Sequence, residues 1–135
     1  METLLLRRST TVRCSGAWES VHGHIESGER AVEAAERELL EETGLVADRL
    51  YNLSRAEYFY LHRSDQVALI PAFAGIIAAE APVVLSGEHD AYRWVGTDEA
   101  LTTLAWPRER RALADLIALL SRGDAGPLED VLRIR

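Results

Sequence analysis

The feature that most constrains the fold of this chain is a strongly helical segment with acidic side chains on one face. Residues Ala31–Thr43 are rich in Ala, Glu and Leu and contain neither Gly nor Pro, which favours an α-helix. Gly44 follows at the position where a C-cap glycine commonly ends a helix. Glu38, Glu41 and Glu42 are spaced i, i+3 and i+4, so they share one helix face. Like charges at these spacings destabilise a helix by about 0.2–0.5 kcal/mol for each pair, so we expect a compensating positive charge.

Two sources of positive charge can compensate this acidic face. The first is a divalent cation, because clustered carboxylate oxygens without Cys or a set of His side chains suit Mg²⁺ or Mn²⁺. The second is an ordinary surface ion pair on a solvated face, because Arg37 lies four residues before Glu41. Glycines flank the helix on both sides, and Glu29 precedes it. These surroundings favour the cation.

The segment from Gly23 to Leu45 resembles the signature of the Nudix hydrolase family. That signature reads Gly, five residues, Glu, seven residues, Arg-Glu-aliphatic, one residue, Glu-Glu, one residue, Gly-aliphatic. The chain matches it with Gly23, Glu29, Arg37, Glu38, Leu39, Glu41, Glu42, Gly44 and Leu45. At average residue frequencies, a chance match is expected about once in a billion starting positions. The resemblance implies an α/β/α sandwich with a mixed β-sheet, in the α/β or α+β class.

The resemblance also implies roles for the charged side chains of the signature. Glu38, Glu41 and Glu42 are expected to be the metal-binding, catalytic carboxylates. Glu29 and Arg37 are expected to belong to the same catalytic centre, as a pair that braces the preceding loop against the helix.

Further ligands and substrate contacts are expected outside the helix. The backbone carbonyl of His22 matches a position that often binds metal in the family. A later loop usually adds an acidic residue, for which Glu88 is the best match and Glu80 the substitute. The segment Glu-His-Asp-Ala-Tyr-Arg-Trp-Val from Glu88 onward resembles one common in nucleotide pyrophosphatases of the family. The candidate substrate contacts are Arg8, Trp18, His24 and Tyr58.

The expected reaction is metal-dependent hydrolysis of a diphosphate linkage. Mg²⁺ or Mn²⁺ would join phosphate oxygens to the carboxylates, and one carboxylate would serve as general base, directly or through a metal-bound water. The segments around Trp18 and Glu88 resemble those of nucleoside and dihydroneopterin triphosphate pyrophosphatases. We therefore expect a (deoxy)nucleoside triphosphate or a pterin triphosphate to be cleaved to a monophosphate and pyrophosphate. The alternatives are an ADP-ribose or dinucleoside polyphosphate hydrolase, and a Nudix domain that binds a nucleotide without hydrolysing it.

Composition and charge exclude other classes of function. The 135 residues suffice for one domain, and their formal net charge of -7 argues against binding to a nucleic-acid backbone. No apolar run approaches the ~20 residues of a membrane span. The N-terminal residues do not have the order of a signal peptide, so we expect a cytoplasmic protein. Cys14 is the only cysteine, which excludes an internal disulfide, and we expect its thiol to be buried.

The pattern along the chain predicts one mixed domain over residues 1–125, with the signature at 23–45 and a short tail at 126–135. Strands are expected at Thr3–Arg8, Trp18–Ile25, Leu50–Leu61, Val67–Ala78 and Tyr92–Val95. Helices are expected at Ala31–Thr43, after a cap at Thr97, and from Pro107 until Gly123. The resemblance predicts a further strand before Leu4, whereas this sequence begins at Met1. Either this strand is absent or shortened, which would leave a sheet edge open or covered by a second subunit of a homodimer, or the true start lies upstream.

Overall fold

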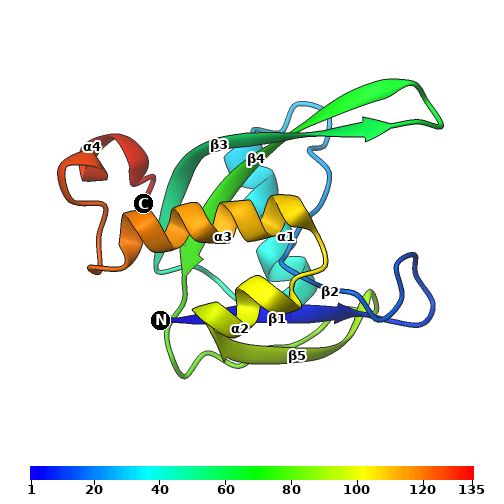
Figure 1. The fold of residues 1–135 in the computed structure, drawn as a ribbon, viewed down its shortest axis with the longest axis horizontal. Helices are drawn as coiled ribbons and strands as arrows, with labels where there is room; N and C mark the ends of the chain where they lie inside the picture. The colour runs from blue at the N-terminus through cyan, green and yellow to red at the C-terminus, as the bar shows by residue number, and fades with distance from the viewer.

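The computed structural model describes all 135 residues and has helices on both sides of its strands. Figure 1 shows α1 behind the strands and α2 and α3 in front of them. The strands are β1 (Glu2–Arg8), β2 (Trp18–Glu19), β3 (Arg49–Leu61), β4 (Gln66–Ile76) and β5 (His89–Gly96). The helices are α1 (Ala31–Thr43), α2 (Thr97–Thr103), α3 (Pro107–Leu120) and α4 (Glu129–Leu132), with a 3₁₀ turn η1 at Gly126–Leu128. None of these helices has the length and apolar character that a bilayer span requires.

The strands form two antiparallel sheets, with the orders β2-β1-β5 and β3-β4. In the first sheet, β1 pairs with β5 from Glu2 opposite Gly96 to Arg8 opposite His89. The α+β class is therefore confirmed, while the single mixed sheet is replaced by two sheets without a parallel pair. The expected strand Trp18–Ile25 is limited to its first two residues, because the chain then leaves the sheet to form the loop before α1.

Helix α1 has the predicted bounds. Gly44 ends it in the left-handed conformation, with φ of 69°, and its N–H donates to the carbonyl of Leu40 at 2.8 Å. At the other end, Glu33 accepts a hydrogen bond from the backbone N–H of Arg30 at 2.8 Å. A carboxylate in the first turn also interacts favourably with the helix dipole. Residues within or next to the helix therefore determine where it begins and ends.

Strands β3 and β4 form a long hairpin that extends beyond the rest of the molecule (Figure 1). The turn between them lies at residues 62–65, between the strands expected at Leu50–Leu61 and Val67–Ala78. Tyr58 lies opposite Leu69, and Tyr60 lies opposite Val67. All four residues are more than half exposed, so large side chains of aromatic and aliphatic residues cover the outer face of the hairpin.

Two apolar clusters form the core, and α3 contributes to both. The cluster between β1, β5 and the front helices contains Leu5, Val95, Ala100, Leu104 and Leu113. The cluster between β3, β4 and the C-terminal residues contains Tyr51, Leu53, Ala74, Leu120, Ala125 and Leu132. Leu113 and Leu120 stand two helical turns apart and so lie on one face of α3. Helix α3 therefore connects two sheets that share no strand.

The C-terminal residues pack against the domain. Leu132 is 6% exposed, within the second core cluster. The N–H of Ile134 donates to the carbonyl of Leu50 at 2.8 Å, and the N–H of Leu50 donates to the carbonyl of Arg135 at 3.0 Å. The segment expected as a tail from residue 126 thus completes the edge of β3.

Two local expectations were wrong. Thr97 is the first residue of α2, and Gly96 is the N-cap, because β5 stays extended until the helix begins. Cys14 is exposed, in the connection between β1 and β2, where its φ of 57° places it in a tight turn.

Candidate active site

One arginine holds the loop before α1 against the helix. Arg37 Nε and Nη2 donate to the two carboxylate oxygens of Glu29 at 2.8 and 3.0 Å. Nη2 also donates to the backbone carbonyl of His24 at 2.9 Å. The hydrogen bonds from Arg37 lower the pKa of the Glu29 carboxyl. A bidentate pair of this kind fixes orientation as well as distance, so the loop is positioned without a ligand.

The third nitrogen of Arg37 contacts two signature carboxylates. Nη1 donates to Glu38 at 2.8 Å and to Glu41 at 3.1 Å. The bonds to Glu29 and then to Glu38 raise the pKa of the guanidinium. Glu38 and Glu41 are thus paired with Nη1 of Arg37, and no three acidic or imidazole groups converge in cation-binding geometry. The surface ion pair considered as the alternative is therefore present, and a cation would have to replace it.

The signature glycine makes room for the first carboxylate. A Cβ atom added to Gly23 would lie 2.0 Å from Glu38 Cδ and 2.1 Å from Glu38 Oε1. Both distances are far shorter than van der Waals contact. The loop and the Glu38 carboxyl can therefore lie this close only because residue 23 has no side chain.

Glu42 is the buried carboxylate of α1. The residue is 4% exposed, and its Oε2 has no hydrogen-bond partner. Burial raises the pKa of Glu42 to about 8, and the negative charges of Glu38, Glu88 and Glu19 add to this effect. A buried polar atom without a partner is costly. The residues fit a hard divalent cation, which would bind the free oxygen and neutralise the surrounding charges.

The loop that carries Glu88 lies against the end of α1. The N–H of Ser86 donates to the carbonyl of Glu42 at 3.1 Å, and the N–H of Ser9 donates to the carbonyl of Glu88 at 2.9 Å. Glu88 is exposed, and its charge contributes to the raised pKa of Glu42. Glu80 is also exposed but is not among the charges that act on Glu42. Of the two later carboxylates, Glu88 therefore has the better position.

A buried acidic side chain that the sequence analysis did not single out lies beside these residues. Glu19 is 0% exposed and accepts hydrogen bonds from Arg8 Nη1 at 2.8 Å, His89 Nε2 at 3.0 Å and Trp106 Nε1 at 3.1 Å. Burial opposes ionisation, but the bonds from His89 and Arg8 outweigh it and hold the pKa of Glu19 at about 2. Arg8, a predicted substrate contact, is thus paired within the protein. Two of the three donors lie 70 or more positions away, so no local pattern indicates this cluster.

Trp18 and His24, two other predicted substrate contacts, differ in their surroundings. The guanidinium carbons of Arg7 and Arg93 lie 5.9 and 5.7 Å from the centroid of the Trp18 ring. The indole is half-buried and also packs against the first core cluster. His24 is exposed, and its backbone carbonyl is bound to Arg37.

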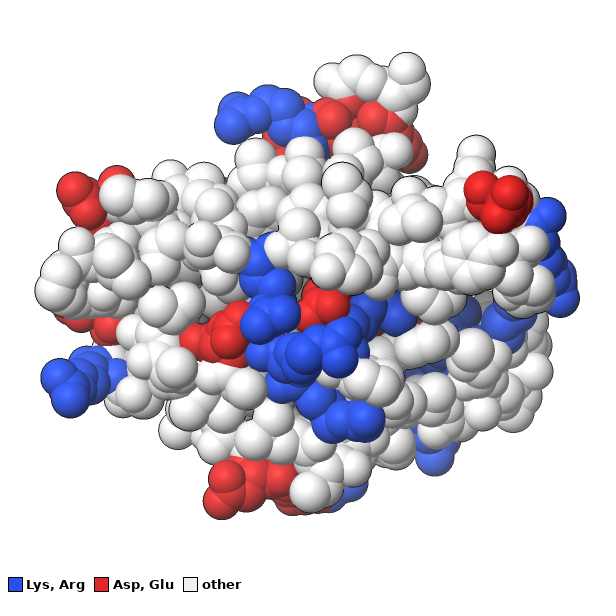
Figure 2. All heavy atoms as spheres, turned by 45° about the horizontal axis from the view of Figure 1, so that its top comes forward, with Lys and Arg blue, Asp and Glu red and all other residues white.

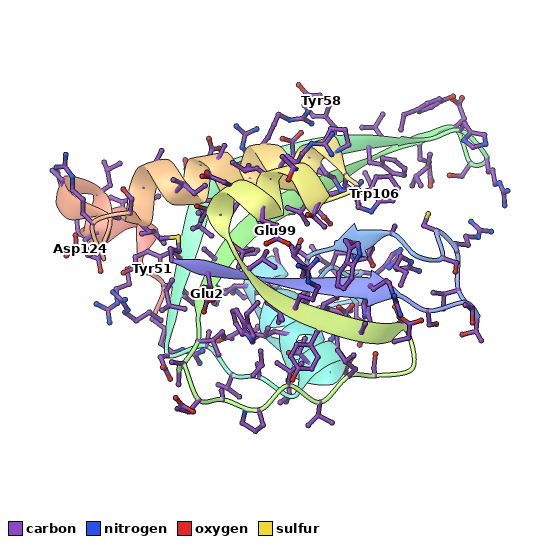
Figure 3. The ribbon with its side chains drawn as sticks, turned by 60° about the horizontal axis from the view of Figure 1, so that its bottom comes forward. Glu2, Tyr51, Tyr58, Glu99, Trp106 and Asp124 are labelled. Atoms are coloured by element: carbon purple, nitrogen blue, oxygen red, sulfur yellow. The ribbon has the colours of Figure 1, made fainter.

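The fourth predicted contact, Tyr58, is 76% exposed on the outer face of the hairpin. Figure 3 shows Tyr58 and Trp106 on opposite sides of the β3–β4 hairpin. The neighbouring Phe59 belongs to the other face of the strand, and its ring meets the Trp106 ring edge to face at a centroid distance of 6.1 Å. A strand at Leu50–Leu61 was expected, but the sequence did not indicate which of its two faces lies toward Trp106.

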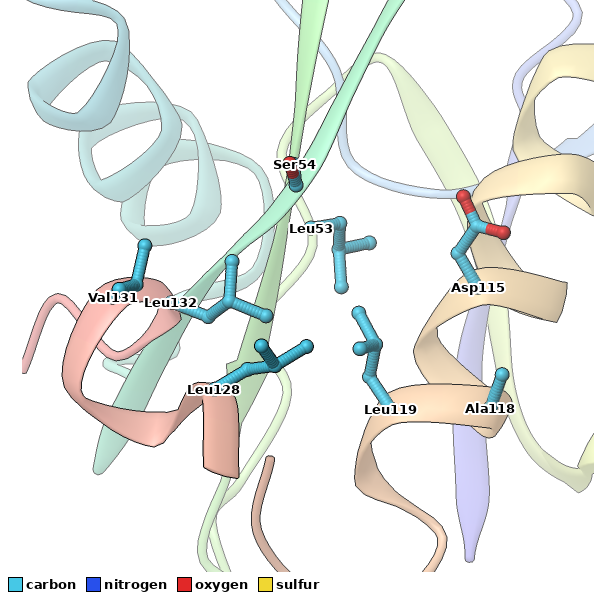
Figure 4. A pocket seen from close by; sticks show the side chains of 8 residues that line it. All are labelled: Leu53, Ser54, Asp115, Ala118, Leu119, Leu128, Val131 and Leu132. Carbon is cyan, nitrogen blue, oxygen red and sulfur yellow. The ribbon is translucent and has the colours of Figure 1, made fainter. Parts of the chain in front are cut away.

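A hollow of about 430 Å³ lies elsewhere, between β3, α3 and α4 (Figure 4). Its lining consists of Leu53, Ser54, Asp115, Ala118, Leu119, Leu128, Val131 and Leu132. None of these is a predicted site residue, and most are apolar. Its chemistry does not match that of a phosphate site, which needs charge or hydrogen-bond donors.

The face that carries α3 and the hairpin has arginine side chains gathered at its centre, with carboxylates among them (Figure 2). Arg55 pairs with Asp115 and, at 2.8 Å, with Glu57. Arg111 donates two bonds of 2.8 Å to the same glutamate. Hydrogen bonds from Arg111 and Arg55 hold the pKa of Glu57 at about 2, although partial burial opposes them. The charges of these four residues therefore compensate one another, and the ion pairs between them join α3 to the hairpin.

Comparison with known proteins places this chain in one family. The NUDIX domain model matches residues 1–116. Over 102 residues, the chain is 38% identical to the asymmetrical bis(5′-nucleosyl)-tetraphosphatase of Rattus norvegicus, across 74% of this chain and 67% of that protein. The chain therefore belongs to the Nudix family. It is a hydrolase, of the pyrophosphohydrolase type.

Solved structures share the architecture. An Ap4A hydrolase from C. elegans, in a binary complex, superposes with a TM-score of 0.73 at 23% identity, over 90% of this chain and 87% of that one. The dihydroneopterin triphosphate pyrophosphohydrolase of E. coli superposes with a TM-score of 0.72 at 26% identity, over 87% and 86% of the two chains.

Proposed function

We propose that this chain hydrolyses dinucleoside polyphosphates asymmetrically, with Mg²⁺ or Mn²⁺ as cofactor. The observation that carries the hydrolytic part is the buried Glu42 carboxylate, which has an unpartnered oxygen among the charges of Glu38 and Glu88. The choice of substrate rests on the 38% identity to the rat tetraphosphatase. This choice reverses the order of the two substrate classes expected from the sequence.

The proposed cation ligands come from three segments of the chain. They are the carboxylates of Glu38, Glu41, Glu42 and Glu88 and the backbone carbonyl of His22. The contact between Gly23 and Glu38 supports the inclusion of His22, because it brings the loop to the acidic face. The packing of the Ser86–Glu88 loop on α1 supports the inclusion of Glu88.

Three side chains of α1 are assigned different roles in hydrolysis. A bound divalent cation supplies charge neutralisation for the phosphate oxygens and the leaving group. Arg37 would keep the loop in place through its hydrogen bonds to Glu29. Its hydrogen bonds to Glu38 and Glu41 would break when these two carboxylates bind the cation. Glu41 is assigned the role of proton acceptor for the attacking water, because its side chain is 59% exposed and so is accessible to that water. Glu42 is buried, and its Oε2 has no hydrogen-bond partner. We therefore assign Glu42 to cation binding and not to proton transfer.

A (deoxy)nucleoside or pterin triphosphate is the second candidate substrate. The 26% identity to the E. coli dihydroneopterin triphosphate enzyme, at a TM-score of 0.72, supports it. Both classes require attack of water on a phosphorus atom of an anhydride, so the same carboxylates would serve either. The residues that contact the rest of the substrate decide between them.

A substrate panel with Mg²⁺ tests the proposal. Diadenosine tetraphosphate, NTPs, dNTPs, dihydroneopterin triphosphate and ADP-ribose are compared by kcat/KM, with products separated chromatographically. We expect diadenosine tetraphosphate to be the best substrate, yielding ATP and AMP. A higher kcat/KM for any triphosphate would contradict the substrate assignment. Full activity in excess EDTA would contradict the metal assignment.

A further inference from the structure

Arg108 has no acidic partner, although aromatic rings hold its side chain in place. Its Cζ lies 4.2 Å from the centroid of the Trp106 ring and 5.4 Å from that of Phe59. The residue is half-buried at the start of α3. None of the salt bridges or hydrogen bonds of the structure involves its guanidinium, unlike those of Arg8 and Arg37. Cation–π contacts fix the position of such a group but leave its N–H donors free.

Arg108 is connected to the signature loop through Trp106. The Trp106 Nε1 donates to Glu19 Oε2 at 3.1 Å, while Glu19 Oε1 lies 3.6 Å from Nδ1 of His22. His22 directly precedes Gly23. The guanidinium therefore lies on the side of the proposed site formed by α3 and the hairpin.

This position matters because the surrounding charges are mostly negative. The chain carries a formal charge of -7, and the arginines next to the carboxylates are already paired. A polyphosphate has more anionic oxygens than a cation at the site would neutralise, and the remaining oxygens need donors of their own. A guanidinium is suited to phosphate because its planar N–H groups match the oxygens. Its fixed position also reduces the entropy lost on binding.

We propose that Arg108 binds a phosphate group of the substrate beyond the two at the metal centre, and so makes the enzyme selective for long polyphosphate chains. The assignment rests on the proposed function, since it concerns the same substrate. Arg108 contributes to binding and not to proton transfer. Its removal should therefore raise KM more than it lowers kcat.

The binding of inorganic phosphates tests this selectivity independently of kcat. Binding of pyrophosphate and of tripolyphosphate is measured by calorimetry with Mg²⁺ for the wild type, Arg108→Gln and Arg122→Gln. Arg122 is an exposed arginine beyond the far end of α3 and serves as the matched control. We expect Arg108→Gln to weaken tripolyphosphate binding about tenfold, as for a lost hydrogen bond to a charged group, and pyrophosphate binding less than twofold. Equal changes for the two ligands, or none, would overturn the assignment.

Kinetics with diadenosine tetraphosphate separate this inference from the proposed function. For Arg108→Gln we expect an increase of about tenfold in KM with kcat within twofold of the wild type, and an intermediate KM for Arg108→Lys. Loss of kcat alone would overturn the role of Arg108. If the wild type hydrolyses no dinucleoside polyphosphate while the tripolyphosphate difference persists, the proposed substrate fails and the phosphate contact stands.

Discussion

Replacement of Glu42 by Gln should stabilise the metal-free protein while it abolishes activity. Burial raises the pKa of Glu42 from 4.5 to about 8, helped by the charges of Glu38, Glu88 and Glu19 and opposed by Arg8. Because the folded-state pKa is the higher one, stability is lost as the pH rises from 4.5 through 8. At about 1.4 kcal/mol for each tenfold change in proton affinity, the upper bound is about 5 kcal/mol. Relaxation and water penetration reduce such penalties, so we expect about 2–3 kcal/mol.

Thermal unfolding in EDTA measures this effect. At pH 8.5, Glu42→Gln should raise the Tm by about 6–10 °C, whereas at pH 5 the two proteins should unfold within about 2 °C of each other. Millimolar Mg²⁺ should then raise the Tm of the wild type and leave that of the variant unchanged. The kcat of the variant should fall by at least about a thousandfold. A variant no more stable than the wild type at pH 8.5 would refute the description of Glu42 as a buried, uncompensated anion.

Three further predictions concern neighbouring residues. Gly23→Ala should lower kcat/KM at least about tenfold with little change in Tm, because the new methyl group displaces only the flexible carboxyl end of Glu38; an active variant would contradict this. Glu88→Gln should lower kcat or weaken Mg²⁺ dependence more than tenfold while Glu80→Gln has no effect, and the reverse result would assign the later ligand to the other loop. Burial raises the pKa of Glu109 to about 7, so stability is lost as the pH rises from 4.5 through 7. Urea unfolding above pH 7.5 should therefore show Glu109→Gln more stable by about 1–3 kcal/mol, with no gain at pH 5.

Local chemistry explains why part of this structure could be predicted from the sequence. Helix α1 begins and ends where its composition and Gly44 indicate. The turn at residues 62–65 follows from polar residues between two apolar runs. The ion pair of Glu29 with Arg37, expected from the resemblance, joins residues only eight positions apart. Short-range features of this kind can be predicted because they depend on residues that are close together in the sequence.

The long-range arrangement could not be predicted in the same way. Glu19 could not be singled out because two of its three donors, His89 and Trp106, lie 70 or more positions away and leave no periodic pattern. The sequence also did not decide which side of the hairpin faces Trp106. Side chains alternate between the two faces of a strand, so Tyr58 and Phe59 lie on opposite faces, but alternation does not tell which face packs against the domain. The pairing of Arg37 with Glu38 and Glu41 showed that a signature compatible with metal is also compatible with an internal ion pair.

The division into two sheets also bears on the order in which the chain folds. The hairpin of β3 and β4 closes over four residues, whereas β1 and β5 are separated by the eighty residues 9–88. Loop-closure entropy makes the second pairing costlier by about 2.7 kcal/mol. On a ribosome, β1 must wait until β5 has been synthesised. We therefore expect the hairpin and α1 to form first and the β1–β5 ladder last, so that the Glu88 loop reaches the acidic helix only in the final step of folding.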